Sequence, residues 1–279
     1  MQADLMHDTE LGTPIQTPFE QASLFGVDFA CLSEAQAVEW VCDRAASQSG
    51  AFVVTANLDH LRRCCVEPEY RKLVEESDLV VADGMPLIWA SRVQGAPLLP
   101  ERVAGSSMTI ALCEQAAARG LSVYLLGGDE GVAEQAAATL IDKHPEIRIA
   151  GFHCPPFGFE KDESEMELIR SKLAEVKPDL ILVALGSPKQ EKLIQAIRAT
   201  CPHACWMGVG ISLSFITGDV VRAPKWVQRS GFEWLHRLVQ EPRRLFKRYI
   251  VQGIPWGLRL LAHAAMKRIR PNRIARSES

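Results

Sequence analysis

The chain has 279 residues, 47% of them hydrophobic, and a net charge of only −3. This composition allows a substantial core, most simply one domain of about 200 residues with an appendage. Neither a low-complexity segment nor a repeat of fixed period occurs, which excludes a disordered scaffold and a solenoid.

The N-terminal segment, residues 1–21, has four acidic residues and no continuous apolar run, so it does not resemble a secretory signal. We expect it to be flexible, and we expect the protein to be cytoplasmic. The eight cysteines lie within predicted helices and strands, as expected of reduced thiols rather than of a disulfide framework.

Helices and short apolar strands alternate through the next 200 residues. Ser33 and Gln36 form a capping-box pattern before an apolar-periodic run to about Ser47, and the β-rich segment 51–55 follows. Further strands are predicted at 78–82, 122–126, 147–152, 179–185 and 204–209. This alternation predicts an α/β fold over residues 22–228, with a Rossmann-like, mostly parallel sheet covered by helices on both faces.

The alternation stops after Pro224, and residues 229–279 are predicted to form a basic helical C-terminal appendage. They contain twelve Lys or Arg and three Glu, a net charge of +9 that leaves −12 for the rest of the chain. The longest apolar stretch, 249–266, is interrupted by two glycines, a proline and an arginine, unlike a membrane-spanning helix of about 20 apolar residues. A basic helix in the membrane interface fits better, although the charge alone suits either a membrane surface or nucleic acid.

In a parallel α/β sheet the ligand crevice lies beyond the carboxyl ends of the strands. Polar residues and glycines follow the predicted strands at Thr55, Asn57, Asp83, Gly84, Gly127, Gly128, Asp129, Gly186, Ser187, Lys189, Gln190, Gly208 and Gly210. We therefore expect one rim of the sheet to form the functional site.

Asp83 directly follows a strand and precedes a helix, where a carboxylate acts either as a helix cap or as a general base. Burial at a strand end would raise its pKa and suit a base that takes a proton from a substrate hydroxyl.

The turn 127–131 resembles a phosphate-binding turn that opens a helix, but its G-G-x-x-G order is not the dinucleotide fingerprint, and a tight turn without ligand is the alternative. The turn 186–191 carries Lys189 and Gln190. For Lys189, a solvated lysine is the alternative to a contact with a donor or acceptor substrate, whereas Gln190 is interpreted as functional.

Several arginines are candidate anion ligands because the planar guanidinium pairs well with phosphate. Arg102 precedes a helical run and would hold a phosphate or an acceptor substrate. Arg237, Arg244 and Arg248 would share one helical face if the helix continues through Pro242.

Motifs of other chemistries are missing from the sequence. It has no Walker A loop, no H-E-x-x-H pair, no G-x-S-x-G elbow and no D-x-D triplet. His60 with Cys64, and Cys201 with His203 and Cys205, are incomplete as zinc ligand sets. We predict neither a metal nor another cofactor. If the reaction releases an anionic leaving group, arginines and backbone N–H groups must offset its charge instead.

A series of short motifs occurs in one order: T-x-N at 55–57, ADGMP at 82–86, ERVAG at 101–105, LLGG at 125–128, PPFG at 155–158, LGSPKQE at 185–191, GVG at 208–210, RAPKW at 222–226 and EWLHRLVQEPRR at 233–244. With these motifs the chain resembles the WecG/TagA/CpsF glycosyltransferases, glycosyltransferase family 26, from about residue 25 to 254.

The resemblance implies a metal-independent, inverting transfer of an N-acetylmannosamine-type sugar from a UDP-sugar donor to a polyprenyl-diphosphate-linked sugar, in surface polysaccharide or teichoic acid synthesis. It also implies that Asp83 is the base and that Thr55, Asn57, Arg102 and Gln190 line the pocket. The appendage would dock on the anionic inner face of the cell membrane and bring Arg237, Arg244 and Arg248 over the diphosphate. Two departures concern the donor: Ser107 and Ser214 stand where family members often have aspartate.

Two rival functions share parts of this pattern. A Rossmann-type oxidoreductase would need the dinucleotide fingerprint after its first strand, where this chain reads TANLD. A nucleic-acid-binding protein could use the basic tail, but the Trp, Leu and Ile beside its arginines fit a lipid interface better, so no nucleic-acid partner is predicted. We also expect self-association, which would cover an exposed apolar docking face.

Overall fold

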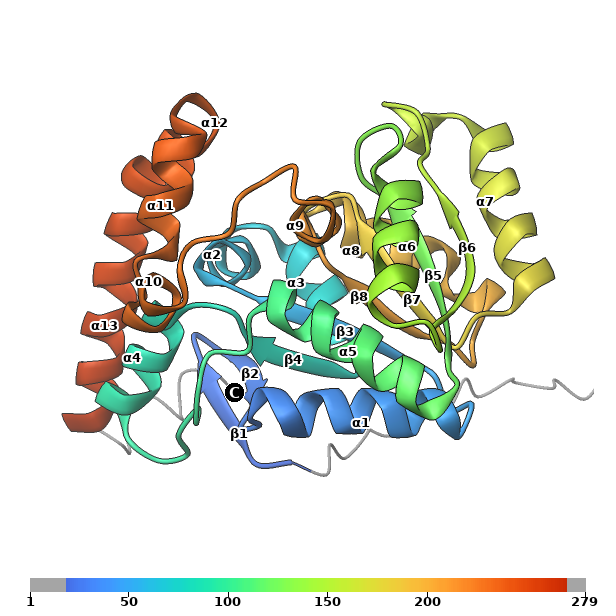
Figure 1. The fold of residues 1–279 in the computed structure, drawn as a ribbon. Helices are drawn as coiled ribbons and strands as arrows, with labels where there is room; N and C mark the ends of the chain where they lie inside the picture. Colours follow the sequence, from blue (N-terminus) through green and yellow to red (C-terminus); the bar gives the residue numbers. More distant parts are fainter. Residues whose placement is uncertain (1–18, 270–279) are drawn as a thin grey trace, which may run out of the picture.

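The computed structural model describes residues 19–269, except for the side chains of residues 225, 229 and 230. Six parallel strands form its central sheet (Figure 1). Their order across the sheet is β4 (Leu79–Ala82), β3 (Ala51–Ala56), β8 (Cys205–Gly208), β7 (Leu180–Ala184), β5 (Ser122–Gly127) and β6 (Arg148–His153). All six predicted strands are confirmed, and the inner ones are buried over their whole length, as their continuous apolar sequences require.

Helices cover both faces of the sheet, which confirms the predicted fold class. One face carries α1 (Glu34–Ala46), α5 (Gly105–Arg119), α6 (Val132–Lys143) and α9 (Ser212–Thr217). The other carries α2 (Leu58–Val66), α3 (Pro68–Glu75), α4 (Met85–Gln94), α7 (Glu163–Val176) and α8 (Lys189–Ile197). The predicted capping box is present, because Ser33 and Gln36 each accept a hydrogen bond from the other's backbone N–H.

An antiparallel hairpin precedes α1, and the sequence reasoning did not predict it. Strands β1 (Gln21–Leu24) and β2 (Val27–Ala30) are joined at Phe25 and Gly26, which both have positive φ. The strands are only four residues long, too short for a clear alternation. The segment expected to be flexible up to residue 21 therefore ends earlier, because β1 already includes Gln21. Residues 1–18 lie outside the described residues.

The C-terminal part is helical and packs against the sheet domain at α4. It comprises α10 (Lys225–Ser230), α11 (Glu233–Gln240), α12 (Pro242–Phe246), a π-helical segment (Lys247–Gly253) and α13 (Ile254–Ile269). Helix α13 runs beside α4 (Figure 1), and Leu260 and Ala264 are fully buried in the core that α4 shares. The expected border at residue 229 falls within α10, and the division into separate units stays a prediction.

The condition for placing Arg237, Arg244 and Arg248 on one helical face is not met. No single helix continues through Pro242, because α11 ends at Gln240 and the φ of Glu241 (−130°) breaks the helix before α12 begins. Among the described residues, no helix is long and apolar enough to cross a membrane.

Candidate active site

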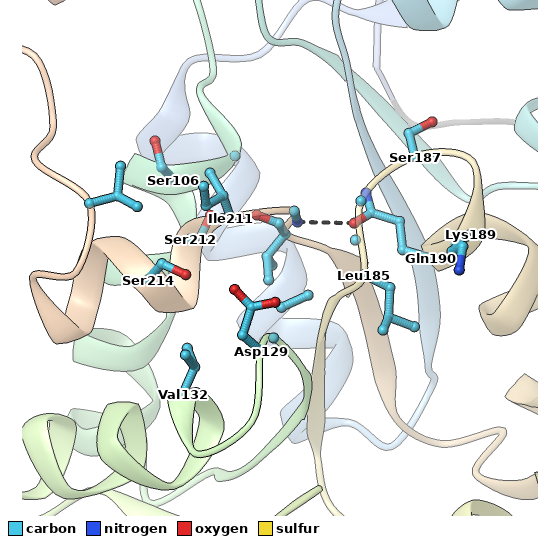
Figure 2. Close-up of a pocket in the computed structure, with 18 of the residues that line it drawn as sticks. Ser106, Asp129, Val132, Leu185, Ser187, Lys189, Gln190, Ile211, Ser212 and Ser214 are labelled. Carbon is cyan, nitrogen blue, oxygen red and sulfur yellow. Dashed lines mark hydrogen bonds between the residues drawn. The ribbon is translucent and has the colours of Figure 1, made fainter. Parts of the chain in front are cut away.

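A cavity of about 1370 Å³ opens at the carboxyl ends of the strands, between the strand-to-helix turns and the helices α11 and α12. Twelve of the fifteen predicted site residues line it: Thr55, Asn57, Asp83, Gly128, Gly186, Lys189, Gln190, Gly208, Gly210, Arg237, Arg244 and Arg248. Gly84, Gly127 and Arg102 do not line it. Within the cavity, Asp129 and Ser214 lie on one side and Leu185 and Gln190 on the other (Figure 2). The rim predicted from the strand ends is thus one connected space.

Asp83 lies at the end of β4, and its environment raises its pKa above the ordinary value. Its backbone N–H donates to Ala56 in the neighbouring strand, and its Oδ2 accepts the N–H of Gly105 at 3.2 Å. Burial raises the pKa of Asp83, Glu233 adds to the rise, and Arg102, the Gly105 N–H and His60 oppose it. Asp83 does not cap the following helix, whose N-cap is Gly84. Its pKa shift is that of a candidate general base.

Thr55 and Gly105 close in around this carboxylate. A Cβ at position 105 would lie 2.7 Å from Thr55 Oγ1 and 3.7 Å from Asp83 Oδ2, so only glycine allows the three residues to meet. Thr55 is largely buried at the end of β3. The hydroxyl and the carboxylate therefore form one small polar pocket in the floor of the cavity.

Asn57 is the N-cap of α2, and this fixes the orientation of its amide. Its Oδ1 accepts the backbone N–H groups of Asp59 (2.9 Å) and His60 (3.3 Å). Within residues 19–269 its Nδ2 has no hydrogen-bond partner, so Asn57 offers the cavity a donor rather than an acceptor.

Gln190 connects the turns that follow β7 and β8. Its Oε1 accepts the N–H of Gly210 at 2.9 Å (dashed in Figure 2), and its Nε2 donates to Glu191 Oε1 at 2.9 Å. A Cβ at Gly208 would come within 2.4 Å of this Nε2, so glycine there makes room for the side chain. Gln190 is 6% exposed, and one amide hydrogen remains for a substrate.

The structure bears on two neighbouring expectations. Lys189 lines the cavity and is also partly exposed to solvent, and its Nζ pairs with Glu160 at 2.6 Å and lies 4.8 Å from the ring centroid of Phe157. The glycine turn after β5 is not an open phosphate cradle, because Gly128 donates its N–H to Ala184 at 2.7 Å and Gly127 is outside the cavity lining. The carboxylates of Asp129 and Glu130, which also line the cavity, disfavour a phosphate there.

Arg102 is held by a carboxylate of the appendage instead of facing the cavity. Its guanidinium donates to Glu233 of α11 at 2.7 Å. The same carboxylate lies 3.8 Å from Arg222, which donates to Ser107 at 2.7 Å. Contacts between residues 131 positions apart leave no signal in a single sequence, and Glu233 was therefore missed.

Three arginines of the appendage form the basic wall of the cavity, although they come from three helical segments. Arg244 pairs with Glu241 at 2.8 Å, and Arg248 lies 3.3 Å from Asp59. Although burial acts to raise it, the pKa of Asp59 is lowered by the guanidinium groups of Arg248, Arg62 and Arg63.

Arg237 is the least compensated of the three. Among the described residues its nearest carboxylate partner is Glu241, at 4.0 Å, and its Nε is buried without a hydrogen-bond partner. This wall suits an anion such as a diphosphate.

The sequence reasoning also missed a buried pair at the cavity floor, because it considered His60 only with Cys64 as an incomplete set of zinc ligands. His60 Nε2 lies 3.5 Å from Glu191 Oε1, and both residues are nearly inaccessible to solvent. Within the described part of the chain, no three His, Cys, Asp or Glu residues are grouped as metal ligands. That the reaction needs no metal stays a prediction.

A cleft at the carboxyl ends of a parallel sheet, with a carboxyl of raised pKa and an arginine wall, is typical of an α/β enzyme and has the composition of an anion-binding site. The family model described as "Glycosyl transferase WecG/TagA/CpsF family" matches residues 22–270, and the chain belongs to this family. It is therefore a glycosyltransferase.

A curated relative supports the assignment. Over 195 residues the chain is 32% identical to the N-acetylglucosaminyldiphosphoundecaprenol N-acetyl-beta-D-mannosaminyltransferase of Bacillus spizizenii (strain ATCC 23059 / NRRL B-14472 / W23), covering 70% of this chain and 73% of that protein.

Proposed function

We propose that the enzyme transfers an N-acetylmannosamine-type sugar from a UDP-sugar to a polyprenyl-diphosphate-linked sugar, with inversion and without a metal. The observation that carries this proposal is that Asp83, with its raised pKa, and the arginine wall line the same cavity. The name of the Bacillus relative supports both the sugar and the lipid-linked acceptor.

In the proposed reaction, Asp83 takes the proton of an acceptor hydroxyl, and the resulting oxygen attacks the anomeric carbon of the donor. The new C–O bond forms as the bond to the diphosphate breaks, so a single displacement inverts the configuration. Arg237, Arg244 and Arg248 stabilise the negative charge that develops on the leaving diphosphate. Thr55 and Asn57 would orient the reacting groups.

The decisive experiment measures UDP release and sugar transfer for a panel of UDP-sugars, with a polyprenyl-diphosphate-sugar acceptor in detergent. We expect transfer of a single sugar, with the same rate in EDTA as in added Mg²⁺, because the arginines supply the positive charge. A reaction that EDTA abolishes and Mg²⁺ restores would contradict metal independence. Folded protein that releases UDP from no donor would contradict the whole proposal.

Membrane docking through the appendage is a second part of the proposal. Phe232, Leu235 and Val239 are spaced three and four residues apart along α11 and are 52%, 44% and 75% exposed. The exposed Arg243 and Lys247 follow α11 along the chain, and exposed apolar side chains with basic residues nearby are typical of an interfacial segment. The acceptor would then be reached at the inner face of the membrane, and association with a second copy would cover the same face in solution.

We expect a Leu235→Glu/Val239→Glu variant to lose most binding to anionic vesicles in a sedimentation assay, because two apolar side chains can no longer enter the acyl region. Ile141→Glu, on α6 and 46% exposed, is the matched control and should bind like the native chain. Equal retention on duplex DNA at matched salt, with no loss in the variant, would favour the nucleic-acid alternative instead.

A further inference from the structure

A continuous series of contacts runs along the cavity floor between two walls of the proposed site, and of its members only Glu191 does not line the cavity. The series begins at Asn57, whose Oδ1 lies 2.9 Å from His60 Nδ1. His60 Nε2 faces Glu191 Oε1 at 3.5 Å, and the same oxygen accepts the Nε2–H of Gln190 at 2.9 Å. Gln190 in turn accepts the N–H of Gly210. The series joins the turns after β3, β7 and β8.

The geometry makes His60 a positioning residue rather than one that contacts substrate. Its Nδ1 lies 2.9 Å from the side-chain oxygen of Asn57 and 3.3 Å from the backbone nitrogen of Asn57, so it donates to the first or accepts from the second according to the tautomer, and its Nε2 faces Glu191. Both ring nitrogens are therefore engaged with the protein, although the ring reaches the cavity lining.

Glu191 is an unusual residue to bury in the first turn of a helix. It is 1% exposed, and its Oε2 has no hydrogen-bond partner in the described part of the chain. Although burial opposes ionisation, His60 and Gln190 lower the pKa of Glu191. A buried carboxylate is costly unless it is paired, so this site would be destabilising if His60 did not compensate it.

We propose that His60 and Glu191 form a positioning pair that holds the amides of Asn57 and Gln190 at fixed places on opposite walls of the cleft. The expected effect on the reaction rate rests on the proposed function, whereas the expected positions of the two amides do not. A displacement of about 1 Å at either amide is enough to lower the rate of a group transfer substantially.

The kinetic test compares His60→Gln, Glu191→Gln and the double variant at saturating donor and acceptor. Gln at position 60 can still accept the N–H of Asn57, as in a capping box, so the start of α2 is preserved. We expect each single variant to lower kcat by up to about 100-fold with a smaller change in KM. The double variant should be no slower than the slower single variant, because the pair acts as a unit.

Ser33→Ala is the matched control, because it removes the other side-chain capping box and lies outside the cavity lining. It should lower the melting temperature and leave kcat unchanged. A loss of kcat that merely follows the melting temperature across all variants, or single-variant losses that multiply in the double variant, would overturn the proposal.

A second measurement needs no substrate. In ¹⁵N-labelled protein, Glu191→Gln should shift the side-chain amide resonances of Asn57, which Glu191 meets only through His60. His60→Gln should likewise shift those of Gln190. Unchanged resonances at these distant amides would overturn the pair even for an active enzyme. Shifted resonances in a protein that transfers no sugar would instead count against the proposed function alone.

Discussion

Asp83→Asn is expected to lower kcat by about 10²- to 10⁴-fold, the range associated with losing a general base. The amide oxygen can still accept the N–H of Gly105, so the local fold and the KM for the donor should change little. The measurement is steady-state UDP release with both substrates saturating. A variant that keeps more than about a tenth of the native kcat would show that another group takes the proton.

The pH dependence of the native enzyme should carry the same signature. A base works only when ionised, and the pKa of Asp83 is raised above the ordinary value of 3.8 by burial and by Glu233. Activity should therefore fall with acid at a pH above 3.8, and the residual activity of Asp83→Asn should lack this limb. Constant native activity down to pH 4 would contradict the assignment.

The same substitution should stabilise the protein at neutral pH. Because the folded-state pKa of Asp83 is raised, the stability that this group contributes is present below its unfolded pKa and is lost as the pH rises through its folded pKa. Asparagine removes the ionised buried group, so the melting temperature of Asp83→Asn should exceed the native value at pH 7 and approach it in acid. Such opposition between stability and activity is common at catalytic sites.

Asp162 provides a control of the opposite sign. It caps α7, and hydrogen bonds from Ser164 and Glu165 lower its pKa. Its contribution is present above the unfolded pKa and is lost as the pH falls through the folded pKa. Asp162→Asn should therefore not raise the melting temperature at pH 7. A rise in both variants would point to a general effect of removing negative charge.

Much of the site could be predicted because it depends on strand ends. Each apolar run is short and β-rich, so its end is easily located, and parallel strands bring their carboxyl ends to one edge. Asp83, Thr55 and Gly208 therefore lie in one cavity, as the sequence predicts.

The rest depends on contacts that have no period or motif. Glu233 meets Arg102, and His60 meets Glu191, across more than a hundred residues. The hairpin before α1 has strands of four residues and a turn at Phe25, a residue type that seldom adopts positive φ. The sequence indicates that Pro242 can interrupt the helix, but the direction in which α12 leaves α11 depends on packing. Arg237, Arg244 and Arg248 nevertheless reach the same cavity.

Arg237→Ala is expected to lower kcat/KM for the donor by about 100-fold or more, a loss comparable to that of a donor in an oxyanion hole. The reason is its unfilled hydrogen-bonding capacity: its Nε is buried without a partner in the described structure, and Glu241 lies 4.0 Å away. Arg237→Lys should restore little, because an ammonium group cannot form the paired hydrogen bonds of a guanidinium group with a diphosphate.

Arg243→Ala separates contact from general attraction. Arg243 belongs to the same basic segment and is exposed, but it does not line the cavity. If the wall acts by direct contact, Arg243→Ala keeps nearly native kcat/KM. If the wall acts only by attracting anions, Arg243→Ala and Arg237→Ala lose kcat/KM alike, and added salt reduces the difference between either variant and the native enzyme.

Calorimetry can then identify the stage of the reaction at which Arg237 acts. UDP carries more negative charge on its terminal phosphate than the UDP-sugar does, and that charge appears as the glycosidic bond breaks. A residue that stabilises the transition state should therefore strengthen UDP binding more than donor binding. Arg237→Ala should weaken UDP more than the intact donor, whereas equal weakening of both would limit Arg237 to holding the donor before transfer.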